Sequence, residues 1–368
     1  MTGKKRIAGI LSAAVAAAAI YFCCARWAGS RGSARENLLR ALPADASAVI
    51  YLDLAQLREA EILKNISPWS AGATADPDYK QFVSETGFDY EKDLDRVGIA
   101  LQTHGTRRSY FARVDGNFDR GKMEAYLRKN GRSEQKDGRE FFHLAASAPG
   151  QTISVMFLSD QQLLLADGAD LAREFESGQR SAGHAEWTKR FERLAGTPLF
   201  ALIRQDAAIG ALLNNQAPGG FSSPQLGQLL NQLLWVSIAG KPEGKEFRAV
   251  LEGECPNEAT MRQLSDFLNG MTIMASAGLN DPKLRRQMDP AEREAYLQLL
   301  SSVEVMKLDR GTSKSVRLTF VVTPEIWGKL AEKPAITKPE EKAAPGAKTN
   351  SSLNKKDERR AEQTARRP

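Results

Sequence analysis

The chain has little cysteine. Three cysteines occur among its 368 residues, and Cys23 and Cys24 lie in an apolar run near the N-terminus. Cys255 is therefore the single thiol of everything that follows, and no disulfide can form within that part of the chain. We expect its fold to be held by a hydrophobic core even in an oxidising compartment. Cys255 itself is expected to be a partly buried thiol, with a reactive role as the alternative.

Histidine is equally rare, which leaves little material for a metal site. His104, His143 and His184 are far apart in the sequence. Only His184-Ala185-Glu186 has the H-x-E pattern, and it lacks the other elements of a zinc site. We therefore expect no metal and no other cofactor, and we expect the histidines to be surface or half-buried residues.

The motifs that mark common enzyme classes are also missing. The sequence has no G-x-S-x-G, H-E-x-x-H, Walker or G-x-G-x-x-G pattern. Asp53 is the most noticeable single acid because it interrupts an apolar run, and we expect it to be exposed at a strand end. No residue is assigned a catalytic role, and we expect a protein that is not an enzyme. A hydrolase with dispersed catalytic residues is an alternative.

Charge is absent from residues 7–24, which directly follow Lys4, Lys5 and Arg6. A helix of this length spans about 27 Å, close to the thickness of the hydrocarbon core of a bilayer. The pattern predicts a transmembrane anchor over residues 7–27, with residues 1–6 in the cytoplasm. The protein is then a single-pass inner-membrane protein whose body lies outside the cytoplasm. Cleavage of a signal peptide, which would give a secreted or periplasmic protein, is the alternative.

Excess positive charge is confined to the two ends of the chain. The formal net charge is +6; residues 1–35 carry +6 and residues 333–368 carry +5, which leaves −5 for residues 36–332. A nucleic-acid-binding protein places its basic surface on the folded domain, so we expect no nucleic acid as a partner. Residues 333–368 are rich in Lys, Pro, Glu, Ala and Arg without apolar periodicity, which predicts a disordered basic tail.

A strand pattern follows a short polar stalk, which we place at residues 28–41. Leu42-Pro43-Ala44-Asp45 precedes an apolar run from Ala48 to Leu54. Together with the apolar segment before it, this opening resembles that of a class of bacterial membrane-anchored proteins of unknown function. The resemblance implies a duplicated extracytoplasmic α+β body and no particular activity.

The chain repeats one order of predicted elements. Val97–Ala100 matches Val236–Ala239, and the distance along the chain between these two segments is called the repeat offset below. Asn130-Gly131 and Asn269-Gly270, separated by the same repeat offset, are each expected to end a helix. Each half is interpreted as β-α-β-β-α-β with an extra strand, close to a ferredoxin-like order with mainly antiparallel sheets, in an α+β fold. The first repeat is expected over residues 42–195 and the second over residues 196–332.

The most unusual segment of the predicted body is residues 207–240, which carry no charge. At 26% charged residues, about nine charges are expected over 34 positions. A buried helix that leads into a buried strand accounts for this, and the alternative is an apolar groove or contact surface. The candidate contact residues are Leu212, Leu213, Phe221, Leu226, Leu230 and Trp235.

These patterns favour a non-catalytic binding or assembly module that a membrane anchor presents outside the cytoplasm. Its partner at residues 207–240 is expected to be a protein or a lipid. The alternative is a carrier or binder of a hydrophobic ligand that uses residues 207–240 as its groove. The oligomeric state is left open.

Overall fold

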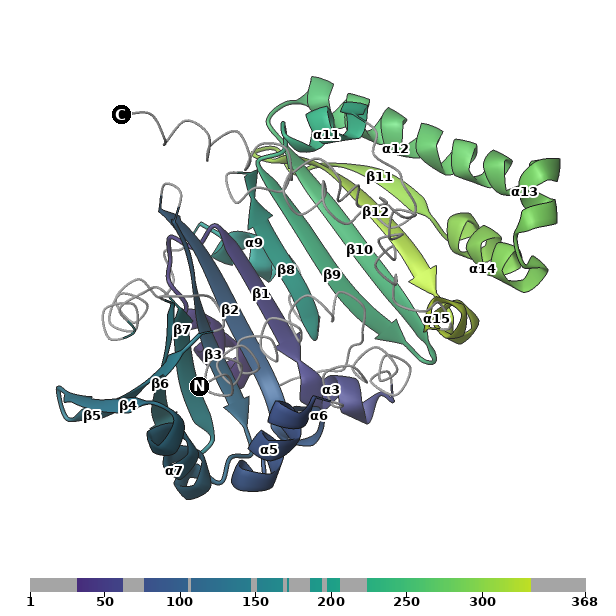
Figure 1. Cartoon of the computed structure of the whole chain (residues 1–368). Coiled ribbons are helices and arrows are strands. Elements are labelled where there is room, and N and C mark those ends of the chain that lie inside the picture. The colour runs from purple at the N-terminus through teal and green to yellow at the C-terminus, as the bar shows by residue number, and fades with distance from the viewer. Residues whose placement is uncertain are drawn as a thin grey trace, which may run out of the picture. The chain divides into compact units, whose positions relative to one another are not determined.

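The structure is a computed structural model, and it describes residues 32–61, 76–104, 107–146, 151–167, 171, 186–193, 197–205 and 224–331 (Figure 1). The predicted anchor (residues 7–27) and basic tail (residues 333–368) lie outside these ranges. Among the residues described, no helix combines the length and the apolar character that crossing a membrane requires. Three candidate contact residues, and the side chain of a fourth, also lie outside the description: Leu212, Leu213, Phe221 and Leu226.

Strands from both halves of the chain pair into one large sheet. The first half contributes β1 (Ala48–Asp53), β2 (Leu94–His104), β3 (Arg107–Gly116), β4 (Arg132–Lys136), β5 (Arg139–Ala145), β6 (Thr152–Ser159) and β7 (Gln162–Asp167). The second half contributes β8 (Leu199–Arg204), β9 (Trp235–Glu243), β10 (Glu246–Cys255), β11 (Glu304–Asp309) and β12 (Lys314–Val322). The order across the sheet is β11-β12-β10-β9-β8-β1-β2-β3-β7-β6-β5-β4. With its helices, this antiparallel sheet confirms the α+β class.

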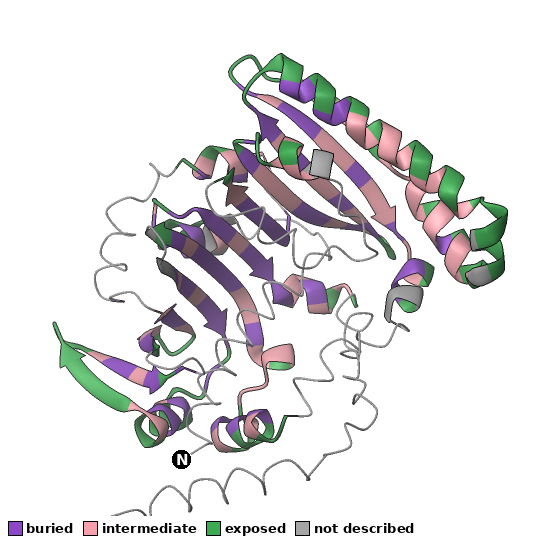
Figure 2. Ribbon diagram, turned by 45° about the horizontal axis from the view of Figure 1, so that its top comes forward, coloured by how far each residue is buried: buried purple, intermediate pink, exposed green. Residues whose placement is uncertain are grey.

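Helices pack on both faces of the sheet (Figure 2). One face carries α2 (Gly32–Arg40) and α9 (Thr188–Glu192). The other carries α3 (Leu54–Glu59), α5 (Pro77–Thr86), α7 (Arg120–Asn130), α11 (Pro224–Leu230), α12 (Glu258–Leu279), α14 (Pro290–Ser301) and α15 (Pro324–Ala331). Two short helices, α6 (Tyr90–Asp93) and α13 (Pro282–Gln287), complete the set that is described.

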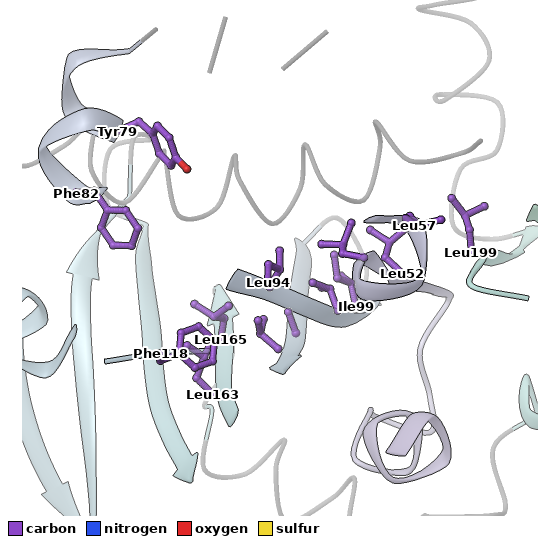
Figure 3. Packing of buried hydrophobic residues seen from close by; sticks show 14 of the residues in the cluster. Leu52, Leu57, Tyr79, Phe82, Leu94, Ile99, Phe118, Leu163, Leu165 and Leu199 are labelled. Carbon is purple, nitrogen blue, oxygen red and sulfur yellow. The ribbon is translucent and has the colours of Figure 1, made fainter. Parts of the chain in front are cut away.

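Alternation along the strands supplies two cores. In β7, Leu163 and Leu165 belong to the cluster beneath α3, α5 and α7, whereas Leu164 belongs to the cluster beneath α2 and α9. Figure 3 shows part of the first cluster, with Phe82 of α5 and Leu57 of α3 among its members. Burial of one such side chain contributes about 1.5–3 kcal/mol. The sheet is therefore stabilised from both sides.

Helix α2 corrects one sequence-based expectation. Residues 28–41 were expected to form a polar stalk, but Leu38 and Leu39 of α2 are buried in the second cluster. The Arg113 side chain of β3 also donates a hydrogen bond to the Asn37 carbonyl, with 3.0 Å between the atoms. The described part of the expected stalk therefore belongs to the folded body.

The two halves join edge to edge through β1 and β8, with Ala48 opposite Ile203. In a ferredoxin-like order, built from split βαβ units, two strands joined by a helix are not paired with each other, because another strand lies between them. Here β1 and β2, which α3, α5 and α6 separate along the chain, pair directly. The expected ferredoxin-like order is therefore not confirmed, because a pattern of elements gives their order along the chain without specifying which strands pair.

The two halves nevertheless share one hairpin register. In the β2–β3 hairpin Val97 lies opposite Val114, and in the β9–β10 hairpin Val236 lies opposite Gly253. The repeat offset separates Val97 from Val236 and also separates Val114 from Gly253. The hairpin alignment made from sequence therefore agrees with the pairing of the strands.

The two predicted helix ends have different outcomes. Helix α7 ends at Asn130, with Gly131 as its C-cap, as expected. Helix α12 instead runs through Asn269-Gly270 to Leu279 and has Asn280 as its C-cap. A glycine within a helix costs about 1 kcal/mol relative to alanine, which the long run of good helix formers after Gly270 offsets.

Candidate interaction surface

The described part of the uncharged segment belongs largely to the core. Leu230, at the end of α11, is half-buried against a cluster that includes Leu233 and Met261. Trp235, at the start of β9, is 2% exposed and belongs to the cluster beneath α2 and α9. Leu230 and Trp235 therefore lie on opposite faces of the sheet. Trp235 is a core residue, and its assignment to an exposed contact surface is wrong.

The surroundings of Trp235 explain its burial. Its Nε1–H donates a hydrogen bond to Glu186 Oε1 at 3.0 Å, so the one polar atom of the indole has a partner. The guanidinium carbon of Arg190 lies 4.5 Å from the centre of the ring, in cation–π geometry. Arg190 belongs to α9, so this contact helps to hold that short helix on the sheet.

Beside Trp235, two glutamates of β10 bind several arginines. Glu252 is 4% exposed, and its carboxylate lies 2.7 Å from both Arg310 Nη1 and Arg317 Nη2. Ser315 Oγ donates to the same carboxylate at 2.9 Å. Burial alone would raise the pKa of Glu252, but hydrogen bonds from the two arginines lower that pKa below its usual value.

Glu254 connects the same strand to α9. Arg190 donates to both carboxylate oxygens of Glu254, at 3.0 and 2.6 Å, and Arg193 Nη1 donates at 3.3 Å. Arg193 also donates to Ser313 Oγ at 3.3 Å. Ser313 directly precedes β12, which pairs with β10. The bidentate Arg190–Glu254 contact joins α9 to β10, and Arg193 adds a second donor to the buried carboxylate of Glu254. The charge cluster thus holds α9 on the sheet and has a structural role.

Asp53 is buried, contrary to the expectation that it is exposed at a strand end. Its Oδ1 accepts the Gln56 backbone N–H at 3.0 Å and caps helix α3. Its Oδ2 accepts from the Tyr51 hydroxyl at 3.3 Å and from Arg96 Nε at 3.4 Å. The acid interrupts the apolar run because it starts a helix and binds the half-buried guanidinium of Arg96.

The first half carries charges at the positions that match the β10 glutamates. Arg113 and Asp115 of β3 precede Glu252 and Glu254, respectively, by the repeat offset. Asp115 lies 3.6 Å from Arg96 and 3.9 Å from Arg113. Burial raises the pKa of Asp115 above its usual value, although the two arginines lower it. Both halves therefore place a buried charge cluster on the same face of the sheet.

The remaining candidates for chemistry have ordinary surroundings. His143 Nδ1 lies 3.0 Å from Ser154 Oγ on the neighbouring strand, and burial lowers the His143 pKa. Cys255, expected to be partly buried, is 2% exposed, and burial raises its pKa to about 11. Within the described ranges, no three His, Cys, Asp or Glu residues are placed to hold a metal ion. His184 and the side chain of His104 lie outside the description.

Helix α12 starts from a firm attachment to the sheet. The Asn257 side chain accepts the Thr260 backbone N–H at 2.9 Å and caps the first turn. Met261 and Leu264, one turn apart, are buried against β10 and β12. Gly253 of β10 permits this close approach, since a Cβ atom there would lie 3.3 Å from the Leu264 side chain.

The outward face of α12 changes from polar to apolar along the helix. Ile273 is 68% exposed and Met274 is 74% exposed, unlike most large apolar side chains of the described chain. From the start of the helix to Asn269 the exposed residues are Glu258, Ala259, Arg262, Gln263, Asp266 and Asn269. In the second half they are Ile273, Met274, Ala277 and Gly278, which we call the α12 apolar face.

The end of α12 that bears this face lies against α14 and leads into α13 (Figure 1). Arg293 of α14 donates from Nη1 to Asn280 Oδ1 at 3.2 Å, so a side-chain contact links the C-cap of α12 to α14. Sequence reasoning missed this surface because it ended the helix at Asn269-Gly270. The available signal was the absence of charge from residues 267–280.

Comparisons with known proteins add little. No protein-family model matches the chain, and no curated protein matches it. Among solved structures, crystal form III of TP0453 covers 80% of this chain and 98% of its own, with a TM-score of 0.44 and 11% identity. Crystal forms I and IV also cover 80% of this chain, with TM-scores of 0.42 and 0.43 and identities of 12% and 9%. At these scores the similarity supports no conclusion about this chain.

Proposed function

We propose that this chain is a non-catalytic binding or assembly module and that it engages a protein partner through the α12 apolar face. One observation carries the proposal: the outward side of a single helix becomes apolar where Ile273 and Met274 stand exposed. Isolated apolar residues are normal on a surface. A contiguous helix face that exposes two large side chains beside Ala277 and Gly278 is typical of an interaction site.

The energetic argument concerns burial. Removal of a side chain such as Ile273 or Met274 from water contributes about 1.5–3 kcal/mol, so the pair supplies a substantial part of a modest affinity. Association also costs conformational freedom. The cap at Asn257, the buried residues Met261 and Leu264, and the Arg293–Asn280 contact fix the helix in advance. A partner therefore meets an ordered surface.

The proposal places this surface outside the cytoplasm, with residues 7–27 as the anchor and residues 333–368 as a basic tail. The support is the charge-free run after Lys4, Lys5 and Arg6. We also propose that the two halves arose by duplication. The shared hairpin register supports this origin, as do the charges at Arg113 and Glu252, which the repeat offset separates.

Among the described residues, nothing specifically favours a lipid carrier or a hydrolase. Leu230 and Trp235 pack in separate cores, so the described part of residues 207–240 forms no common groove wall. Both alternatives stay predictions from the sequence.

The test uses a photo-crosslinking amino acid at position 273 of the full chain in expressing cells. Gln263 is the matched control site, because it lies on the outward side of the same helix in its polar half. We expect protein adducts from position 273 and at least tenfold fewer from position 263. Absence of any protein adduct from position 273 would contradict the proposed function.

A further inference from the structure

The proposed function leaves the partner open, and the inference made here rests on that function. We propose that the partner is a second copy of this chain, with two α12 helices packed antiparallel across a two-fold axis near Met274. A two-fold contact uses the same patch on both copies, so the patch must be complementary to itself. Shape and charge along the helix both meet this condition.

The shape of the face suits an antiparallel pair. Ile273 and Met274 are its large residues, and Ala277 and Gly278 follow one turn later on the same outward side. With an antiparallel two-fold axis just after Met274, the large residues Ile273 and Met274 of one copy lie against the small residues Ala277 and Gly278 of the other. A Cβ atom at Gly270 or Gly278 would meet nothing within 4 Å, so both glycines leave open space for a neighbouring helix.

Charge selects the same direction. Asp266 is exposed eight residues before Met274, and nine residues after Met274 comes Lys283, also exposed. The exposed charges at that end are Asp281, Lys283, Arg285 and Arg286, so bases outnumber acids there. The residues from Asp266 to Met274 span roughly 12 Å of α12, whereas Lys283 lies beyond the end of α12, in α13. An antiparallel pair brings Asp266 of each copy to the basic α13 end of the other. A parallel pair would set like charges together, so charge opposes it.

The charge balance disfavours a bilayer as the occupant. Residues 258–301, which comprise α12, α13 and α14, contain five Lys or Arg and six Asp or Glu. A helix that lies on an anionic membrane is rich in basic residues on its polar face. The polar half of α12 exposes one base, Arg262, and two acids, Glu258 and Asp266. These charges suit a protein partner better than anionic headgroups.

The expected dimer is weak in dilute solution. One helix per copy buries an area at or below the low end of stable interfaces, which begin at about 1,200 Å². We therefore expect association in the micromolar range for the isolated chain. A membrane anchor, as proposed for residues 7–27, would raise the effective concentration of the copies and favour the pair.

The test is cysteine crosslinking of the full chain in membranes of expressing cells, with Cys23 and Cys24 replaced by serine. Cys255 remains, because it is buried and its raised pKa keeps the thiol protonated. Met274→Cys lies beside the proposed axis, and Gln263→Cys is the control. We expect a disulfide-linked dimer from Met274→Cys in at least tenfold higher yield than from Gln263→Cys.

Two differently tagged chains then test direction. We expect a crosslink between a chain that carries Asp266→Cys and a chain that carries Lys283→Cys. We expect none between two chains that both carry Asp266→Cys, because the two copies of this residue lie on opposite sides of the axis. Crosslinking of Asp266→Cys with itself as strongly as with Lys283→Cys would overturn the antiparallel arrangement. Asp266→Lys is expected to lower the Met274→Cys yield severalfold.

The outcomes separate this inference from the proposed function. If Met274→Cys stays monomeric while photo-crosslinking from position 273 gives adducts with a different protein, the second copy is overturned and the binding module stands. If position 273 yields lipid adducts alone, a bilayer is the occupant and both proposals are overturned. Absence of all adducts also overturns both.

Discussion

Glu252 of β10 and Arg317 of β12 are direct partners across neighbouring strands, and Arg317 Nη2 lies 2.7 Å from Glu252 Oε2. A second guanidinium, that of Arg310, binds the same carboxylate at 2.7 Å. Burial removes most of the hydration of Glu252, so its charge depends on these two arginines. Arg310 and Arg317 therefore stabilise the buried negative charge of Glu252 where β10 pairs with β12.

The first prediction concerns the loss of this charge. Glu252→Gln leaves Arg310 and Arg317 without their carboxylate, and we expect a loss of about 2–4 kcal/mol in the free energy of unfolding. Both arginines are partly exposed, which keeps the loss below the upper end for fully buried pairs. The control is Glu243→Gln, which breaks an exposed pair with Arg248 and should cost less than about 1 kcal/mol. Urea denaturation of both variants tests the difference, and equal losses would contradict a special role for Glu252.

The second prediction concerns pH. The pKa of Glu252 is lower in the folded chain than in the unfolded chain, because hydrogen bonds from the arginines outweigh burial. Its contribution is then fully present above the unfolded pKa, about 4.3, and is lost as the pH falls through the folded pKa. The stability difference between the native chain and Glu252→Gln should therefore be full at pH 7 and shrink below about pH 4.3. Denaturation at several pH values measures it, and a difference that grows towards acid would contradict the assignment.

Sequence reasoning recovered the elements better than their arrangement. The two hairpins, the repeat offset between them and the cap of α7 could be predicted from local patterns. Alternation, capping residues and glycine each act over only a few positions. Pairing of β1 with β8 depends on contacts between segments far apart in the sequence, and no local pattern specifies it. The helix end expected at Asn269-Gly270 failed because packing and helix-forming neighbours outweighed the local signal of one glycine.

The candidate surface shows the same limit. Absence of charge over residues 207–240 marked a segment correctly as unusual, but the same composition suits a core and a contact surface. The structure places Trp235 in a core and exposes Ile273 and Met274, which lie in a shorter charge-free run. Exposure depends on which side of α12 faces the sheet and α14. The run without charge, residues 267–280, covers every side of the helix and therefore does not indicate which side is exposed.

The third prediction follows from the burial of Trp235. Trp235→Ala removes a side chain of the second core, its hydrogen bond to Glu186 and the ring beneath Arg190. We expect a loss of about 3–5 kcal/mol in the free energy of unfolding. Met274→Ala is the comparison, because that side chain is exposed and its loss should change stability by less than about 0.5 kcal/mol. Thermal denaturation distinguishes them; similar midpoints would contradict the burial of Trp235.

The fourth prediction concerns the thiol of Cys255. Burial and the nearby Glu254 charge raise its pKa to about 11, so the reactive thiolate is scarce at neutral pH. With Cys23 and Cys24 replaced by serine, we expect a maleimide or disulfide reagent to label the folded chain at least a hundredfold more slowly than the urea-unfolded chain. Mass spectrometry follows the labelling. Comparable rates in both states would show an accessible thiol.

The last prediction tests the difference between the two halves at one matched position. Val114 and Gly253 occupy equivalent places in the two hairpins, opposite Val97 and Val236. A Cβ atom at Gly253 would lie 2.9 Å from Leu233 Cδ1 and 3.3 Å from Leu264 Cδ2, so Gly253→Val forces α12 and the chain after α11 outward. We expect a loss of about 1–3 kcal/mol in the free energy of unfolding from this overpacking.

Gly270→Ala is the matched control, because a Cβ there meets nothing within 4 Å and alanine favours the helix by about 0.5–1 kcal/mol. Opposite signs in urea denaturation would establish that β10 keeps its glycine to admit α12, whereas a neutral Gly253→Val would contradict the close packing of that helix.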